Sequence, residues 1–145
     1  HALQWIAAEE REYASVAILQ PTSPLRRSCD IDAAIEAYLE TDANSLVGVC
    51  APREDPFDLL VPVGEKARFL IPENRHEDYP QFHFLSGAIY LILAQLVLDE
   101  GISYEENMAT YEMDWISSFD IDTPQDLEIA TILMRNRLQG WANKD

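Results

Sequence analysis

Residues 17–32, AILQPTSPLRRSCDID, mark the point where an apolar segment gives way to a polar corner. The apolar run SVAILQ at residues 15–20 predicts a short buried strand that ends at Gln20. Pro21 and Pro24 follow, and each proline fixes its backbone angle φ, which holds the hydroxyl side chains between them in place. The sequence therefore predicts a rigid, polar turn at the end of a buried strand.

A helix and a second strand follow this turn. Apolar residues recur at helical spacing over residues 30–39, and the run SLVGVC at residues 45–50 is typical of another buried strand. A strand, a helix and a strand in succession form a βαβ unit, which predicts a parallel pair of strands joined by a right-handed crossover. The fold class is therefore α/β.

The rest of the chain alternates between loops and further elements. Five of the eight prolines fall within residues 51–81, which are expected to be mostly loop. Residues 108–113 fit neither a helix nor a strand clearly. The other predicted elements are helices at residues 2–14 and 93–100, a helix from Thr123 through Leu138, and strands at residues 67–71, 82–89 and 115–121.

Composition restricts the classes of function. The 145 residues fit one domain, and 26 acidic against 10 basic residues give a formal charge of −16. This charge argues against unaided binding to nucleic acid or to an anionic membrane, because both would be repelled. No apolar run is long enough to span a membrane, and no signal-peptide pattern is present, so a cytoplasmic protein is expected. Cys29 and Cys50 lack metal-ligand spacing and are expected to be free thiols.

The turn after the first strand contains the first group of candidate binding residues. Ligands of open α/β sheets bind beyond the carboxyl ends of strands, where Gln20, Thr22 and Ser23 lie in this sequence. Arg26 adds a planar guanidinium suited to a carboxylate or a phosphate. The alternative is an ordinary rigid turn with surface arginines, and spacing alone leaves both interpretations open.

Asp120 and Asp122 form the second group. Alternate side chains of a strand share a face, so both carboxylates are expected to point the same way. Two such oxygen ligands suit Mg²⁺, which prefers one or two carboxylates together with substrate phosphates. The alternative is that Asp122 belongs to the start of the following helix and that Asp120 is solvated.

The third group lies between Arg75 and Tyr90. His76 and His83 are candidate ligands or bases, although a histidine in a loop more often serves neither role. Gly87 interrupts a predicted strand, and glycine in a strand often marks a bulge or a close approach by another group. Tyr90 either shares a face with Ser86 or belongs to the core.

Taken together, these groups resemble one family. The motifs are LQPTSPLR at residues 19–26, RHEDYP at 75–80, SGAIY at 86–90 and DIDTPQD at 120–126. They are similar, in order and spacing, to motifs of the CMP-sialic acid synthetases, or acylneuraminate cytidylyltransferases, including relatives that act on legionaminic, pseudaminic or deaminated nonulosonic acids. The resemblance extends over nearly the whole chain. It implies one domain over residues 1–145, with a three-layer Rossmann-like nucleotidyltransferase fold and a mostly parallel sheet.

The resemblance also implies a function. Family members transfer CMP from CTP to a nine-carbon acidic sugar with the help of Mg²⁺, and they form homodimers, for which residues 91–119 are the expected region. The implied residues for the sugar acid are Gln20, Thr22, Ser23, Arg26, Arg75, His76, Ser86, Gly87 and Tyr90. The implied residues for catalysis and Mg²⁺ are Asp120 and Asp122.

Several positions depart from the family pattern. The basic residue that meets the substrate carboxylate falls on His76, with Arg75 beside it, and we expect Arg75 to serve, with His76 as the alternative. The family's usual Asn before GAIY is Ser86, and a frequent Lys is replaced by Asp58. These changes keep open a nucleotidyltransferase that acts on a different acidic sugar.

The largest departure is the lack of a Gly-rich basic loop resembling ARGGSKG, which wraps the CTP phosphates in the family. His1 is also not an initiator methionine. The chain is therefore expected to be the C-terminal two-thirds of such an enzyme, truncated at the N-terminus and inactive alone. The alternative function is a catalytically inactive domain that serves as a dimerising or sugar-acid-binding module.

Overall fold

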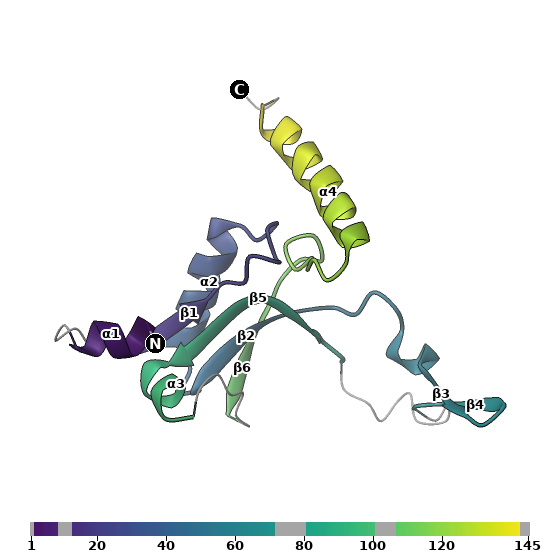
Figure 1. Cartoon of the computed structure of the whole chain (residues 1–145), viewed down its shortest axis with the longest axis horizontal. Coiled ribbons are helices and arrows are strands. Elements are labelled where there is room, and N and C mark those ends of the chain that lie inside the picture. Colours follow the sequence, from purple (N-terminus) through teal and green to yellow (C-terminus); the bar gives the residue numbers. More distant parts are fainter. Residues whose placement is uncertain (1, 9–12, 72–80, 101–106, 143–145) are drawn as a thin grey trace.

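The structure, a computed structural model, describes residues 2–8, 13–71, 81–100 and 107–142 of the chain. At its centre is a mixed sheet with the strand order β1-β5-β2-β6 (Figure 1). The strands are β1 Ser15–Ile18, β2 Ser45–Cys50, β5 Phe84–Leu93 and β6 Met108–Glu112. Strands β1, β2 and β6 run in one direction, as expected for a mostly parallel sheet, and β5 runs against them.

The expected strand–helix–strand unit forms, but its two strands are not neighbours. Strand β1 leads through helix α2 (Ser28–Leu39) into β2, and the two strands run in the same direction. Strand β5 lies between them and pairs antiparallel with both, so the prediction of a direct parallel pair is wrong. The apolar run of β5 suits this central position, in which seven successive residues of the strand are buried.

Helices cover both faces of the sheet and form two core layers. On one face α2 contributes Ala34 and Tyr38, which pack with Leu46, Leu91 and Met113. On the other face α3 (Ala94–Glu100) contributes Leu96 and Val97, which pack with Val47, Tyr90 and Ile92. Helix α1 (Ala2–Ala8) contacts α3. Helices on both sides of the sheet give the expected three layers.

The predicted helices are largely confirmed. The helix expected at residues 93–100 is α3, and the one expected after Thr123 is α4 (Pro124–Ala142). The first helix ends at Ala8, residues 9–12 lie outside the described residues, and residues 13–14 are not helical. None of the described helices combines the length and the apolar character needed to cross a bilayer.

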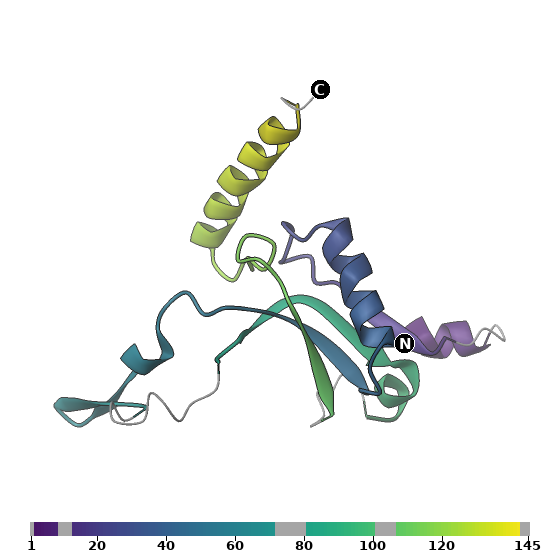
Figure 2. The same ribbon diagram turned by 180° about the vertical axis from the view of Figure 1, so that it is seen from behind.

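A β-hairpin projects from the body of the protein (Figures 1 and 2). It consists of β3 (Leu60–Val63) and β4 (Lys66–Phe69), and a short 3₁₀ helix, η1 (Pro56–Asp58), precedes it. The strand predicted at residues 67–71 is therefore present, whereas its partner β3 falls in a segment that was expected to be loop. The prolines of this segment had argued against a strand. Pro62 is tolerated because β3 belongs to a two-stranded hairpin, in which both strands are edge strands.

The predicted strand at residues 115–121 is wrong. Residues 115–118 form a turn, and the strand lies earlier, at β6, where the sequence pattern was ambiguous. The carboxylate of Asp114 explains the turn, because it accepts hydrogen bonds from the backbone N–H of Ser117 at 2.9 Å and from its hydroxyl at 2.8 Å. After this turn the chain reaches α4, whose inner face packs Ala130, Leu133 and Met134 with Leu25 and Phe119.

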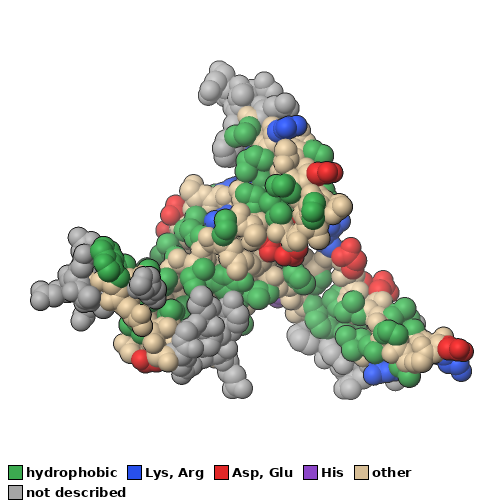
Figure 3. Space-filling view, in the orientation of Figure 1, with side chains coloured by type: hydrophobic (Ala, Val, Ile, Leu, Met, Phe, Trp, Pro, Cys, Tyr) green, Lys and Arg blue, Asp and Glu red, His purple; other side chains and the backbone are tan. Residues whose placement is uncertain are grey.

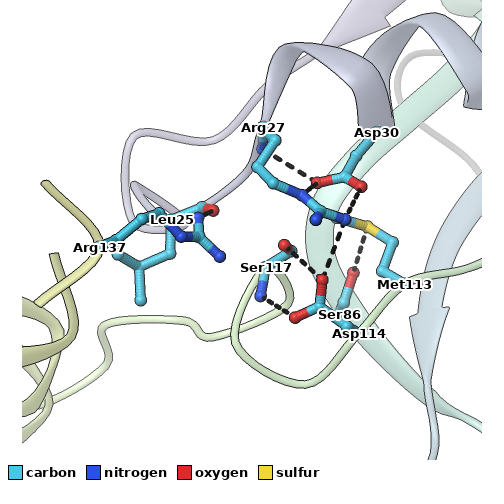
Figure 4. Close-up of polar contacts among 8 residues, drawn as sticks. All are labelled: Leu25, Arg27, Asp30, Ser86, Met113, Asp114, Ser117 and Arg137. Carbon is cyan, nitrogen blue, oxygen red and sulfur yellow. Dashed lines mark hydrogen bonds and ion pairs between the residues drawn. The ribbon is translucent and has the colours of Figure 1, made fainter. Parts of the chain in front are cut away.

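An ion-pair network joins the start of α2 to this turn (Figure 4). The guanidinium of Arg27 lies 2.6 Å from the carboxylate of Asp30 and 3.0 Å from that of Asp114. Burial alone would raise the pKa of Asp30, but hydrogen bonds from Arg27 outweigh it and hold this pKa below its ordinary value. The network therefore stabilises the fold while Asp30 is ionised.

We expect Asp30→Asn to lower the free energy of unfolding at pH 6 by about 1–3 kcal/mol, because Arg27 loses its charged partner. The folded-state pKa of Asp30 lies below the unfolded one, so its contribution is present above about pH 4 and is lost as the pH falls further. The deficit of the variant should shrink in acid, as urea unfolding at several pH values would reveal. Asp32→Asn, at an exposed position of α2, is the matched control. Equal stability of the two variants at pH 6 would contradict the assignment.

Candidate active site

A cleft of about 680 Å³ opens at the end of the sheet where β1, β2 and β6 finish and β5 begins. Its walls come from the turn after β1, the segment after β2, the start of β5 and the segment between β6 and α4. The lining residues that matter below are Gln20, Arg53, Glu54, His83, Ser86, Gly87, Tyr90, Trp115, Asp120, Asp122 and Asp126. Segments far apart in the sequence thus meet where the loop positions of an α/β sheet predict a ligand site.

Three of the predicted site residues converge on Gly87. A Cβ atom at this position would lie 3.0 Å from Oε1 of Gln20, 3.5 Å from Oδ2 of Asp120 and 3.7 Å from the hydroxyl oxygen of Tyr90. Gly87 has a φ of 71°, a left-handed conformation that other residues rarely adopt. Glycine therefore adopts the left-handed backbone conformation without strain, and its lack of a side chain leaves room for the polar groups around it.

Two hydrogen bonds hold the turn after β1 against the segment that contains Asp120. The hydroxyl of Ser23 donates to Oδ1 of Asp120 at 3.1 Å, and the N–H of Ile121 donates to the carbonyl of Thr22 at 2.9 Å. Ser23 is fully buried. Ser23 therefore positions Asp120, and Thr22 contributes its backbone carbonyl to the same contact.

Arg26 supports the site from behind. Its Nη1 donates to the carbonyl of Ala88 at 2.6 Å and to that of Gln20 at 3.3 Å, and burial lowers the pKa of its guanidinium. The side chain was predicted to contact substrate, but it is not among the residues that line the cleft. In this structure it braces the turn after β1 against the backbone of β5.

Ser86 lines the cleft, yet its hydroxyl is directed into the sheet. This hydroxyl donates to the carbonyl of Gly48 at 3.0 Å and accepts the N–H of Ala88 at 3.3 Å. The pairing of β2 with β5 shifts register between Val47 and Val49. A Cβ at Gly48 would lie 3.0 Å from Oγ of Ser86, so the glycine is needed at this irregularity.

Asp122 lies just before the start of α4, as one of its two interpretations expects, and it also lines the cleft. Its side chain lines the cleft, and its backbone N–H donates to Oδ2 of Asp126 at 3.2 Å. The same carboxylate of Asp126 accepts the hydroxyl of Thr123 at 2.7 Å, which lowers the pKa of Asp126. Asp122 is thus tied to the helix start through its backbone N–H and is also one of the residues that line the cleft.

The remaining predicted residues separate into two groups. Arg75 and His76 lie outside the described residues. His83 lines the cleft, where its Nε2 lies 3.7 Å from a carboxylate oxygen of Glu112. Among the described residues no cluster of three or more His, Cys, Asp or Glu side chains forms a metal site, so Asp120 and Asp122 offer an acidic pair alone.

Sequence reasoning missed a pair of cleft residues, Arg53 and Trp115. The guanidinium carbon of Arg53 lies over the indole ring of Trp115, 4.8 Å from its centre. Arg53 follows β2 in a segment that was expected to be loop, and Trp115 was assigned to a strand that does not form. Neither residue belongs to a motif, so no signal in the sequence connected them.

Comparisons with known proteins identify proteins of similar sequence. No family model matches the chain. An N-acylneuraminate cytidylyltransferase of Escherichia coli O18:K1:H7 is 26% identical over 130 residues, which are 87% of this chain and 31% of that protein. Proteins of the same name from Streptococcus agalactiae are 28% identical over 113 residues, 75% of this chain and 27% of theirs. Over most of its length, the chain is thus similar in sequence to proteins named N-acylneuraminate cytidylyltransferase.

A second kind of relative carries another name. The post-translational flagellin modification protein B of Campylobacter coli is 22% identical over 122 residues, 82% of this chain and 52% of that protein. The chain thus spans about half or less of the length of the cytidylyltransferases and other curated relatives that it matches.

The fold has a counterpart among solved structures. The crystal structure of 2-C-methyl-D-erythritol 4-phosphate cytidylyltransferase from Thermus thermophilus matches with a TM-score of 0.60 at 18% identity. The match covers 92% of this chain and 67% of that one. It confirms the predicted Rossmann-like α/β fold of the cytidylyltransferases.

We expect Gly87→Ala to displace the amide of Gln20 from the cleft, because the new methyl group would lie 3.0 Å from its oxygen. Gly64→Ala is the matched control, since Gly64 has a φ of 61° and a Cβ placed there would meet no atom within 4 Å. Both variants should lose roughly 1–2 kcal/mol of stability from backbone strain. Nuclear magnetic resonance should show a shifted side-chain amide of Gln20 in Gly87→Ala alone. An unmoved amide would refute the crowding.

Proposed function

We propose that this chain carries the sugar-acid site of a cytidylyltransferase that transfers CMP from CTP to a sialic-acid-type nonulosonic acid. The observation that supports this most is the meeting of Gln20, Tyr90 and Asp120 around Gly87 in one cleft. These residues belong to separate motifs of the sequence, and the named relatives match most of the chain that carries those motifs. The cytoplasm is the proposed location, in keeping with the free thiols of Cys29 and Cys50.

The proposed reaction joins a sugar hydroxyl to the α-phosphate of CTP and releases pyrophosphate. The protein would contribute positioning and electrostatic stabilisation, as in other transfers of this kind. The amide of Gln20 and the hydroxyl of Tyr90 are suited to orient sugar hydroxyl groups, since each offers a donor and an acceptor. Gly87 keeps the backbone open so that a ligand can approach.

Asp120 and Asp122 are the proposed residues for Mg²⁺. The hydroxyl of Ser23 donates a hydrogen bond to Oδ1 of Asp120, whereas Oδ2 lies beside Gly87. Asp122 also lines the cleft. This donor set fits Mg²⁺, which binds through one or two carboxylates together with phosphates and water. When bound, Mg²⁺ would neutralise charge on the triphosphate.

The electrostatics of the cleft make this ion important. Four carboxylates of the described lining face the cleft, from Glu54, Asp120, Asp122 and Asp126. An anionic nucleotide entering such a cleft is repelled unless cations balance these charges. We therefore propose that nucleotide binding depends on the divalent ion.

The first test is turnover by the 145-residue chain. With CTP, Mg²⁺ and N-acetylneuraminic acid, we expect binding of the sugar acid but little release of pyrophosphate, because the sequence lacks the Gly-rich basic loop that wraps CTP phosphates in the family. A coupled pyrophosphate assay beside calorimetry would measure both. Robust turnover would show that the chain needs no further phosphate-binding segment, and absence of sugar-acid binding would refute the proposed function.

The second test concerns the acidic pair. Mn²⁺, which shares the preference of Mg²⁺ for oxygen ligands, should broaden the amide resonances of Asp120, Asp122 and Gly87. Asp120→Asn should weaken the apparent Mn²⁺ affinity at least about 10-fold. Asp32→Asn removes the same charge from an exposed position of α2 and should leave the affinity unchanged. Equal broadening in both variants would exclude a metal site at this pair.

A dimerising module is the second candidate function, and exposed apolar surface favours it. Figure 3 shows hydrophobic side chains gathered on α4 and on the β3–β4 hairpin. On the hairpin, the cross-strand pair Leu60 and Phe69 is 56% and 40% exposed. A two-stranded hairpin is marginally stable in water by itself, so a partner surface would stabilise it. The homodimer and its predicted region, residues 91–119, remain proposals beside this hairpin.

Light scattering coupled to size exclusion distinguishes these surfaces. We expect the chain to be a dimer at micromolar concentration and Leu60→Asp to shift it toward monomer, because a charge in an apolar interface is costly. Leu98→Asp, at a 39% exposed position of α3 within residues 91–119, is the comparison. Dissociation by Leu98→Asp alone would favour the predicted region, and a monomeric wild type would refute the module.

A further inference from the structure

Arg53 differs from the other arginines that lie near the cleft. It is the one Arg or Lys among the described residues that line the cleft. Arg26 donates to backbone carbonyls and Arg27 pairs with Asp30 and Asp114, so both guanidinium groups serve the fold. Arg53 is exposed to the cleft and contacts an aromatic ring instead.

A stack of aromatic rings supports the guanidinium of Arg53. Its Cζ lies 4.8 Å from the centre of the Trp115 ring, within the range of a cation–π contact. Trp115 in turn meets Phe119 edge to face at 5.7 Å, and Phe119 packs in the core with Leu25. The guanidinium is therefore held on a platform that the core anchors. A guanidinium that lies over an aromatic ring can still present N–H donors to a ligand.

The charges of the cleft indicate what Arg53 would bind. Asp120 and Asp122 are assigned to a divalent ion, which leaves Arg53 as the fixed cation of the described lining. One planar guanidinium matches a single carboxylate with two parallel hydrogen bonds, whereas a triphosphate carries more charge than one arginine can balance. We propose that Arg53 binds the carboxylate of the acidic sugar and selects acid over neutral sugars, an inference that rests on the proposed function.

The test compares N-acetylneuraminic acid with its methyl ester, which keeps the sugar and removes the charge. Calorimetry on the 145-residue chain should show tighter binding of the acid than of the ester. Arg53→Met should weaken binding of the acid at least about 10-fold and leave the ester unchanged. Arg53→Lys should fall between them, because it keeps the charge and loses the planar fork.

Arg135→Met is the matched control, since Arg135 is an exposed arginine of α4 that is not among the lining residues. It changes the net charge equally and should leave the preference for the acid intact. Thermal unfolding of both Met variants, each at an exposed site, establishes that the fold persists. Trp115→Leu should weaken acid binding less than Arg53→Met does, because the guanidinium remains but loses its platform.

The possible results distinguish a failure of the Arg53 assignment from a failure of the proposed function. A wild-type chain that does not bind the acid refutes both. Acid binding that survives Arg53→Met overturns the assignment of Arg53 alone, and loss of the preference in Arg75→Met instead would transfer the role to the residue that the family resemblance implies. Weakened CTP binding with unchanged acid binding in Arg53→Met would also overturn the assignment, because Arg53 would then serve a phosphate.

Discussion

The contact between the turn after β1 and the segment before α4 holds two walls of the cleft together. It consists of two hydrogen bonds, from Ile121 to the carbonyl of Thr22 and from Ser23 to the carboxylate of Asp120, and it joins residues almost one hundred positions apart in the sequence. The carboxylate of Asp120 therefore lies on the same side of the cleft as Gln20, which belongs to the turn after β1. The buried hydroxyl of Ser23 holds one carboxylate oxygen of Asp120, and the other oxygen lies beside Gly87.

The central strand β5 forms another wall of the cleft beside this contact. It enters the sheet at the cleft, and its left-handed residue Gly87 lies where the side chains of Gln20, Tyr90 and Asp120 come together. Arg26 ties the turn after β1 to the backbone of β5 beside this point. The ion pairs of Arg27 fix the turn that precedes Asp120. The walls of the cleft are thus held in place by contacts of backbone and buried groups.

The elements with regular apolar patterns and the residues with recognisable motifs could be predicted from the sequence. Strand β2, helix α2 and the start of α4 at Thr123 follow the expected pattern because local hydrophobicity and capping decide them. The position of β5 between β1 and β2 could not be predicted, since strand order depends on which apolar run is buried most. The turn at residues 115–118 also escaped prediction, because Asp114 closes it through a side chain that local patterns ignore. The contact between Arg53 and Trp115 depends on that turn, so it could not be predicted either.

The strand order also bears on how the chain folds during synthesis. Strands β1 and β2 precede β5 in the sequence, yet neither pairs with the other, and both pair with β5. Among the described strands of this sheet, no neighbouring pair can form until residue 84 and those after it have left the ribosome, and every ladder of β1 closes a loop across about half of the chain. Such distant pairing slows folding and leaves apolar strands unpaired meanwhile. In a nascent chain, β1 and β2 would therefore expose unpaired backbone groups and apolar side chains until the central strand emerges.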